Sequence, residues 1–270
     1  MMTQLEKAEA LQKLHAGDET FVIPNPWDIG SARMFEGLGF KALATTSSGF
    51  AYTLGRIDGQ VTLDEKLAHC RLLAAATTVP ISADLENLFA HDPETAAKTI
   101  TLVAETGIVG GSIEDYDGEK IYDFSLAIER VQAAVEASKS LDFPFGLMAR
   151  AENLIRGVHD LDDTIRRLQA FEAAGADLLY APGLRTLEDV KLVVESVNKP
   201  VNVLVSTMAD RSVTVSDLAE VGAKRISIGG AMALVAYGAL IEGGNEMAEK
   251  GTFGWLNKIS TGRRVSQLLG

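Results

Sequence analysis

Short apolar runs recur along the chain, and each is followed by a segment with the spacing of an amphipathic helix. Strands buried on both faces of a parallel sheet contain continuous apolar runs, whereas half-exposed strands alternate. We therefore predict eight buried strands, at residues 21–23, 42–44, 81–83, 111–113, 145–148, 178–180, 201–204 and 226–228.

Polar residues mark where the intervening helices are expected to begin. A Thr, Ser or Asp before an apolar helical pattern can accept hydrogen bonds from the first free N–H groups of the helix. The expected caps are Thr62 (with Glu65 as a capping box), Asp92 (before Pro93), Asp160, Thr186 and Ser216. Glycines shortly before a strand are typical of helices that end in the left-handed conformation, here Gly39, Gly107, Gly175 and Gly222.

Eight β/α units in about 250 residues predict an α/β protein, a single (β/α)8 TIM barrel. A doubly wound parallel sheet is the alternative fold. Residues 1–20 are expected to form an added N-terminal helix, and residues from about 240 to 270 a helical C-terminal tail. Since no linker rich in Pro, Gly or Ser divides the chain, we expect one domain over residues 1–270.

Composition narrows the class of protein. Of the 270 residues 47% are hydrophobic, which excludes a disordered chain. The net charge of -12 argues against nucleic acid and anionic membranes as partners. The single cysteine, Cys70, excludes an intramolecular disulfide framework and is expected to be buried in a helix. The polar N-terminus resembles no signal peptide, so a cytoplasmic protein is expected.

Four carboxylates follow predicted strands, at the end of the barrel where catalytic residues gather: Asp58, Asp84, Glu86 and Glu114. Clustered carboxylates raise one another's pKa unless a cation neutralises them. Oxygen ligands without His or Cys suit Mg²⁺ or Mn²⁺. Any one of these residues could instead cap the helix that follows it, but together they favour a metal site.

Two further strand ends carry candidate chemistry. Arg150 follows an apolar run, and a charge at the end of a buried strand needs an anionic partner. That partner could be Glu152, a metal-site carboxylate or a substrate carboxylate. The small residues Ser47, Ser48 and Gly49 could offer backbone N–H groups to an oxyanion or simply form a turn. His15 and His69 fall in predicted helices and are expected at the surface.

Seven short motifs, in order along the chain, together resemble the isocitrate lyase/phosphoenolpyruvate mutase superfamily. They lie at residues 26–28, 46–50, 55–58, 83–86, 112–115, 149–150 and 200–203, and the resemblance runs from about residue 21 to 230. It implies a TIM barrel that assembles as a homo-oligomer, a dimer or a tetramer, with a swapped eighth helix. It also implies a small anionic substrate and Mg²⁺-dependent cleavage or rearrangement of a C–C or C–P bond. That bond lies next to the carbonyl of a 2-oxo acid or phosphonate, and the reaction passes through an enolate.

The resemblance also implies roles for particular residues. Mg²⁺ would be bound mainly by Asp84, with Asp58, Glu86 and Glu114 holding it through waters. Substrate would contact Trp27, Ser48, Gly49, Phe50, Arg150 and Asn202, and the catalytic residues would be Asp58, Arg150 and Lys120.

The chain departs from the superfamily in the loop after the fourth strand. Lyases of the superfamily carry Lys-Lys-Cys-Gly-His there, whereas residues 114–123 contain neither Cys nor His, so an isocitrate or methylisocitrate lyase is disfavoured. Lys120 matches the loop lysine of the mutase and hydrolase branches, but Tyr122 replaces their asparagine. A catalytically weak protein that binds 2-oxo acids is therefore the alternative function. A Schiff-base aldolase is disfavoured because no predicted strand ends in lysine.

Overall fold

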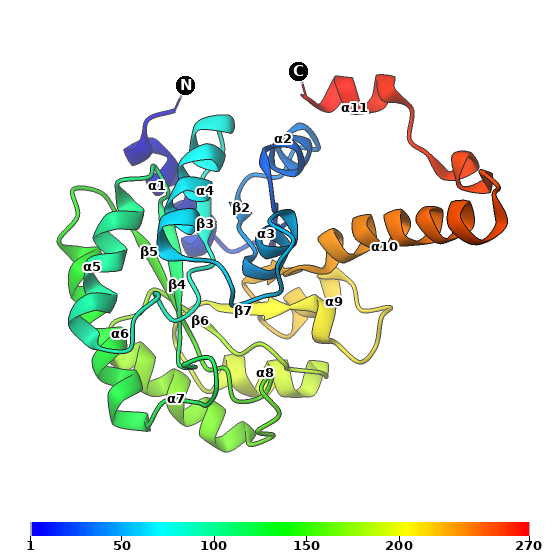
Figure 1. Cartoon of the computed structure of the whole chain (residues 1–270). Coiled ribbons are helices and arrows are strands. Elements are labelled where there is room, and N and C mark those ends of the chain that lie inside the picture. The colour runs from blue at the N-terminus through cyan, green and yellow to red at the C-terminus, as the bar shows by residue number, and fades with distance from the viewer. Residues whose placement is uncertain (1, 270) are drawn as a thin grey trace.

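The computed structural model describes residues 2–269, and its eight strands form one parallel sheet. The strand order is β1-β8-β7-β6-β5-β4-β3-β2, and a hydrogen bond from the Ala44 amide to the Pro24 carbonyl links its two ends. This nearly closed barrel confirms the (β/α)8 prediction and excludes the doubly wound alternative (Figure 1). The strands are β1 (Phe21–Ile23), β2 (Leu43–Ala44), β3 (Ile81–Ala83), β4 (Gly110–Glu114), β5 (Gly146–Arg150), β6 (Leu178–Tyr180), β7 (Val201–Leu204) and β8 (Arg225–Ser227).

Helices alternate with the strands and surround the barrel (Figure 1). They are α1 (Gln4–Ala16), α2 (Ile29–Gly37), α3 (Ser47–Thr53), α4 (Leu63–Ala76), α5 (Pro93–Ala104), α6 (Phe124–Lys139), α7 (Leu161–Ala173), α8 (Leu187–Glu195), α9 (Val215–Glu220), α10 (Ala231–Asn245) and α11 (Gly262–Leu269). The predicted caps Thr62, Asp92, Asp160 and Thr186 are confirmed. The predicted start at Ser216 is wrong, because Thr214 and Asp217 form a capping box that begins α9 earlier.

Alternation along the strands separates two kinds of buried side chain. One set faces the helices and forms the main apolar core, in which Leu147 and Val203 lie. The opposite set faces the barrel interior, where Met148 and Tyr180 belong to a small separate cluster. Most polar and charged strand residues also alternate with the core residues and so face the barrel interior, namely Glu114, Arg150, Asn202, Arg225 and Ser227.

The two ends of the chain are used differently. Helix α1 packs its buried Ala8 and Leu11 against Ile23 and Val109, so it covers the amino-terminal end of the barrel. Helix α10 extends away from the barrel, and the chain then returns so that α11 lies on α2, where Leu268 contacts Gly37 (Figure 1). Within residues 2–269 the structure contains no helix both long enough and apolar enough to cross a membrane.

Candidate active site

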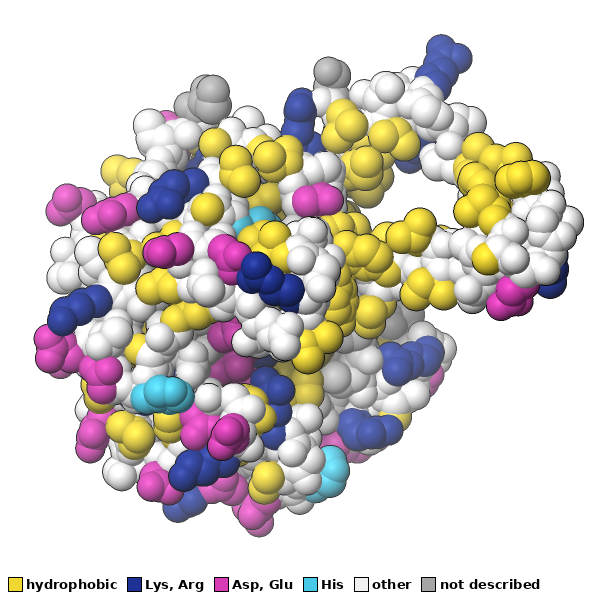
Figure 2. Space-filling view, in the orientation of Figure 1, with side chains coloured by type: hydrophobic (Ala, Val, Ile, Leu, Met, Phe, Trp, Pro, Cys, Tyr) yellow, Lys and Arg dark blue, Asp and Glu magenta, His cyan; other side chains and the backbone are white. Residues whose placement is uncertain are grey.

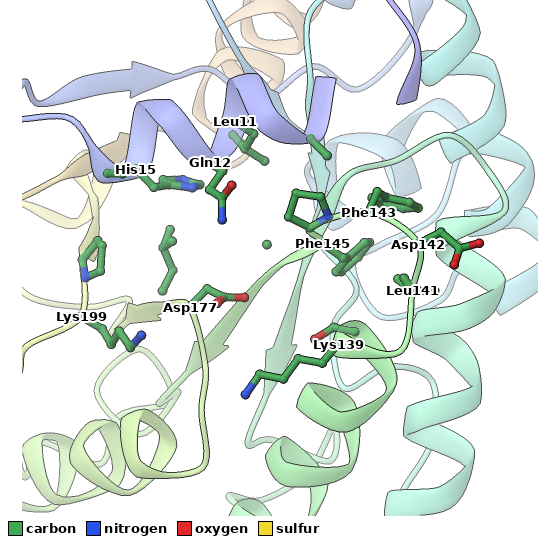
Figure 3. Close-up of a pocket in the computed structure, with 17 residues that line it drawn as sticks. Leu11, Gln12, His15, Lys139, Leu141, Asp142, Phe143, Phe145, Asp177 and Lys199 are labelled. Atoms are coloured by element: carbon green, nitrogen blue, oxygen red, sulfur yellow. The ribbon is translucent and has the colours of Figure 1, made fainter. Parts of the chain in front are cut away.

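A cavity of about 190 Å³ lies at the carboxyl ends of the strands. Five of the residues predicted from the sequence line it: Ser48, Asp58, Asp84, Glu114 and Arg150. A larger pocket, of about 610 Å³, lies at the opposite end of the barrel, between α1 and the segments that lead into β5, β6 and β7 (Figure 3). None of the predicted site residues lines that larger pocket, so size does not identify the candidate site here.

Arg150 is the centre of the carboxylate cluster. Its Nη1 lies 3.0 Å from Asp84 Oδ1 and 2.9 Å from Glu114 Oε1, and its Nε donates to Glu152 Oε1 at 2.8 Å. The pairing of β4 with β5 places Glu114 directly opposite Arg150. Burial lowers the pKa of Arg150, but Glu114, Glu152 and Asp84 outweigh this and raise it above the ordinary value. Two of the three partners considered from the sequence, Glu152 and the predicted metal-site carboxylates, are therefore present together.

The carboxylates differ in how their charge is compensated. Burial opposes ionisation of Asp84, yet Arg150, Lys66 and the Ser47 amide, which lies 3.1 Å from Asp84 Oδ2, lower its pKa. Glu86 has the opposite balance, because burial and then the repulsion of Asp84 raise its pKa to about 7. Burial also raises the pKa of Glu114 well above the ordinary value. Two of the four predicted ligands thus hold their negative charge at a cost.

These donors fit a hard divalent cation. All four predicted ligands are carboxylates, and Glu86 Oε1 is buried without a hydrogen-bond partner. Residues 2–269 do not bring three acidic, His or Cys side chains directly around one point. Instead the guanidinium of Arg150 lies between Asp84 and Glu114. Such an arrangement suits one direct ligand with the others acting through water, rather than a cage of direct ligands.

Trp27, Gly49 and Phe50 do not line the cavity but lie beside it. The Trp27 carbonyl accepts a hydrogen bond from His69 Nε2 at 3.0 Å, and the Phe50 ring stacks on the His69 ring with centroids 3.8 Å apart. The surface position expected for His69 is therefore wrong, since it is only 5% exposed. Its position under Trp27 and Phe50 explains the burial of an otherwise polar helix residue.

Three other predicted residues also lie outside the cavity lining: Glu86, Lys120 and Asn202. Lys120 belongs to the short hairpin closed by the bridge between Tyr116 and Ile121, and its amide donates to Asp117. Asn202 is buried, donates from Nδ2 to Ser227 Oγ at 2.9 Å, and has no partner for Oδ1.

Two positively charged residues near the site were not identified from the sequence. Lys66 of α4 is fully buried, its Nζ has no hydrogen-bond partner, and its charge lowers the pKa of both Asp84 and Glu86. Arg225 of β8 lines the cavity itself. Each stands where the local pattern calls for an apolar residue, Lys66 beside Leu67 and Arg225 at the head of an apolar run. That mismatch was the signal available in the sequence.

Known proteins resemble this chain in sequence and in fold. The family model described as phosphoenolpyruvate phosphomutase matches residues 11–248. A solved structure from Burkholderia cenocepacia, described as a lyase/mutase, shares 45% identity over 98% of this chain and 95% of its own, with a TM-score of 0.94. A 2,3-dimethylmalate lyase shares 26% identity over 100% and 96% of the two chains, with a TM-score of 0.85. An oxaloacetate acetylhydrolase in complex with its product oxalate shares 26% identity over 98% and 94%, with a TM-score of 0.86.

Proposed function

Because this chain belongs to the phosphoenolpyruvate mutase family of the isocitrate lyase/phosphoenolpyruvate mutase superfamily, whose members cleave or rearrange C–C or C–P bonds, we propose a specific reaction class for it. The protein performs Mg²⁺-dependent cleavage or rearrangement of a C–C or C–P bond next to the carbonyl of a small 2-oxo acid or phosphonate, through an enolate. The observation that carries this proposal is the cluster of Arg150, Asp84 and Glu114 on the wall of one cavity.

In this proposal Asp84 holds the metal directly, and Asp58, Glu86 and Glu114 hold it through waters. When bound, Mg²⁺ supplies a fixed positive charge that favours the enolate form of the substrate. Arg150 holds Asp84 and Glu114 in place through ion pairs of 3.0 and 2.9 Å and lowers the pKa of Asp84, while its Nε donates to Glu152. In the proposal, Arg150 and the Ser48 side of the same cavity also contact a substrate oxygen.

The loop after β4 favours the mutase or hydrolase branch over the isocitrate-lyase type of reaction. It lacks Cys and His, and the Tyr122 hydroxyl is held by His91 Nδ1 at 2.8 Å. Tyr122 is therefore not free to replace the missing cysteine as a proton donor. Lys120 lies on the hairpin outside the cavity, so its catalytic role in this proposal requires the hairpin to close over bound substrate.

The decisive experiment is Asp84→Ala, assayed against 2-oxo acids and phosphonates with Mg²⁺ and with EDTA. Loss of the fixed charge array is expected to reduce kcat/KM by about 10²–10³-fold or more. Arg150 keeps Glu114 and Glu152 as partners in this variant, so the protein should remain folded. Asp210→Ala, which removes an exposed carboxylate bonded to Ser212, is the matched control and should retain full activity. Undiminished turnover in Asp84→Ala, or in EDTA, contradicts the proposal.

The same activity assays, together with Tm measurements, distinguish the proposed enzyme from the alternative, a catalytically weak protein that binds 2-oxo acids. That alternative is favoured by the loop that lacks a free proton donor. It predicts that oxalate with Mg²⁺ raises the Tm of the wild-type protein while no compound of the panel is turned over.

We further propose that the protein acts in the cytoplasm as a homo-oligomer built on α10.

A further inference from the structure

Arg225 enters the candidate active site from β8. It is 3% exposed, and the strand register places it between Phe21 of β1 and Asn202 of β7. Ile226 faces the helices, so alternation directs Arg225 into the barrel. Its side chain forms part of the wall of the cavity that Arg150 and Asp84 also line.

Arg225 is the unpartnered arginine of this cavity within residues 2–269. Arg150 is committed to three carboxylates, and Arg156 pairs with Glu152 at 3.1 Å. Arg225 makes no ion pair, no hydrogen bond of its guanidinium is found, and its Nε is buried without an acceptor.

Other buried arginines of the protein confirm that this is unusual. Arg130 donates to the carbonyls of Asn87, Ala90 and Glu114, and Arg167 pairs with Asp115 and Asp163. A buried cation without a counter-charge is costly, and proteins normally compensate it. Burial lowers the pKa of Arg225 to about 10, so it still carries its charge at neutral pH.

His15, whose pKa Arg225 lowers, cannot supply the counter-charge, because an imidazole is either neutral or positively charged. Burial and the nearby Arg225 and Lys224 lower its pKa to about 3, so the imidazole is neutral at physiological pH. Asn202 is the register neighbour of Arg225, and its free Oδ1 does not reach the guanidinium within hydrogen-bond distance. Asp84 acts on Arg225 only through its charge and forms no ion pair with it, so the guanidinium is available to a ligand.

We propose that Arg225 is a specificity-determining residue that binds a second anionic group of the substrate, a carboxylate at the end remote from the reacting carbonyl. The inference rests on the proposed function, because it takes the 2-oxo acid end to lie at Asp84 and Ser48. A planar guanidinium with free N–H groups matches a carboxylate bidentately. The cavity, with the volume of about six water molecules, suits a small diacid.

Chain-length-matched ligands test this directly by calorimetry in the presence of Mg²⁺. Malate and 2-hydroxybutanoate differ by one distal carboxylate, and oxalate probes the metal end alone. The wild-type protein should bind malate about 10–100-fold more tightly than 2-hydroxybutanoate. Arg225→Met should abolish this preference while changing oxalate affinity less than about threefold. Arg225→Lys should retain part of it, because the charge remains but the planar fork is lost.

The Tm of the ligand-free protein provides a second readout. Arg225→Met removes an uncompensated buried charge and should raise Tm, whereas loss of a structural arginine would lower it. Equal binding of malate and 2-hydroxybutanoate by the wild type, or a parallel loss of oxalate binding in Arg225→Met, overturns the inference. If oxalate with Mg²⁺ fails to bind the wild type, the proposed function itself is wrong.

Discussion

At the scale of single residues, His69 connects the buried core to the site. It donates to the Trp27 carbonyl and stacks on Phe50, and burial lowers its pKa to about 3. Below its ordinary pKa of 6.5 the unfolded chain takes up a proton that the folded protein resists. The stability associated with His69 is therefore present above pH 6.5 and is lost as the pH falls towards 3.

We expect this effect to appear as a difference between the wild type and His69→Gln, which remains neutral and can still donate. Between pH 7 and pH 5 the free energy of unfolding of the wild type should fall by about 2 kcal/mol more than that of the variant. Urea denaturation at several pH values measures it. Because Asp115 and Glu86 titrate in the same range with raised pKa values, only the difference between the two proteins is diagnostic. Parallel pH profiles would show that His69 is protonated in the folded state.

At the scale of single residues, the sequence predicts which residues lie at the site but not which of them contact one another. The positions of Asp84, Glu114 and Arg150 follow from strand ends that an apolar pattern reveals. Their pairing does not, because which carboxylates surround Arg150 depends on strand register. Lys66 and Arg225 lie within apolar patterns, where a single charge appears as an exception and its surroundings cannot be inferred.

At the scale of elements, the hydrophobic pattern was sufficient to predict the eight strands and their order along the chain. All eight predicted strands are present, since parallel strands buried on both faces leave continuous apolar runs. β4 and β5 continue one and two residues beyond the predicted runs, to Glu114 and Arg150, because charged strand ends interrupt the apolar signal. The hairpin at 116–121 was not predicted, since its single bridge depends on the surrounding loops.

The start of α3 is the element on which the candidate site most depends. Thr46 caps it and accepts from the Gly49 amide. A methyl group at Gly49 would lie 2.6 Å from Thr46 Cγ2 and 2.9 Å from Trp27 Cβ. Gly49→Ala should therefore displace the cap, lower the free energy of unfolding by about 1–3 kcal/mol and reduce kcat/KM.

Gly30→Ala, in the neighbouring α2, is the matched control. Its nearest new contact, Asp28 Oδ1, lies at an ordinary 3.5 Å. Replacing a helical glycine there should leave activity intact and stabilise the protein by about 0.5–1 kcal/mol. Urea denaturation and steady-state kinetics compare the two variants. Equal behaviour of Gly49→Ala and Gly30→Ala would mean that close packing at α3 does not position the site.

At the scale of the whole molecule, α10 is an apolar helix that the rest of residues 2–269 leaves largely uncovered. It carries no charge before Glu242, yet only Ala233 and Gly243 are buried. Exposed apolar side chains lie along the projecting segment, and open space separates it from the part of the chain that returns to α2 (Figure 2). Helices that are apolar on all sides are normally buried, so this surface is suited to a second copy of the chain.

We therefore expect the wild type to have a mass of at least two 28.8-kDa chains in solution. Leu240 and Ile241 are 67% and 61% exposed, and the double variant Leu240→Glu/Ile241→Glu places two charges where a partner's apolar surface would pack. Size-exclusion chromatography with light scattering should find this variant at the mass of one chain. Leu192→Glu, at an exposed position of α8, is the control and should keep the wild-type mass. An unchanged mass in the double variant, or a monomeric wild type, would mean that the exposed face of α10 is not an oligomer interface.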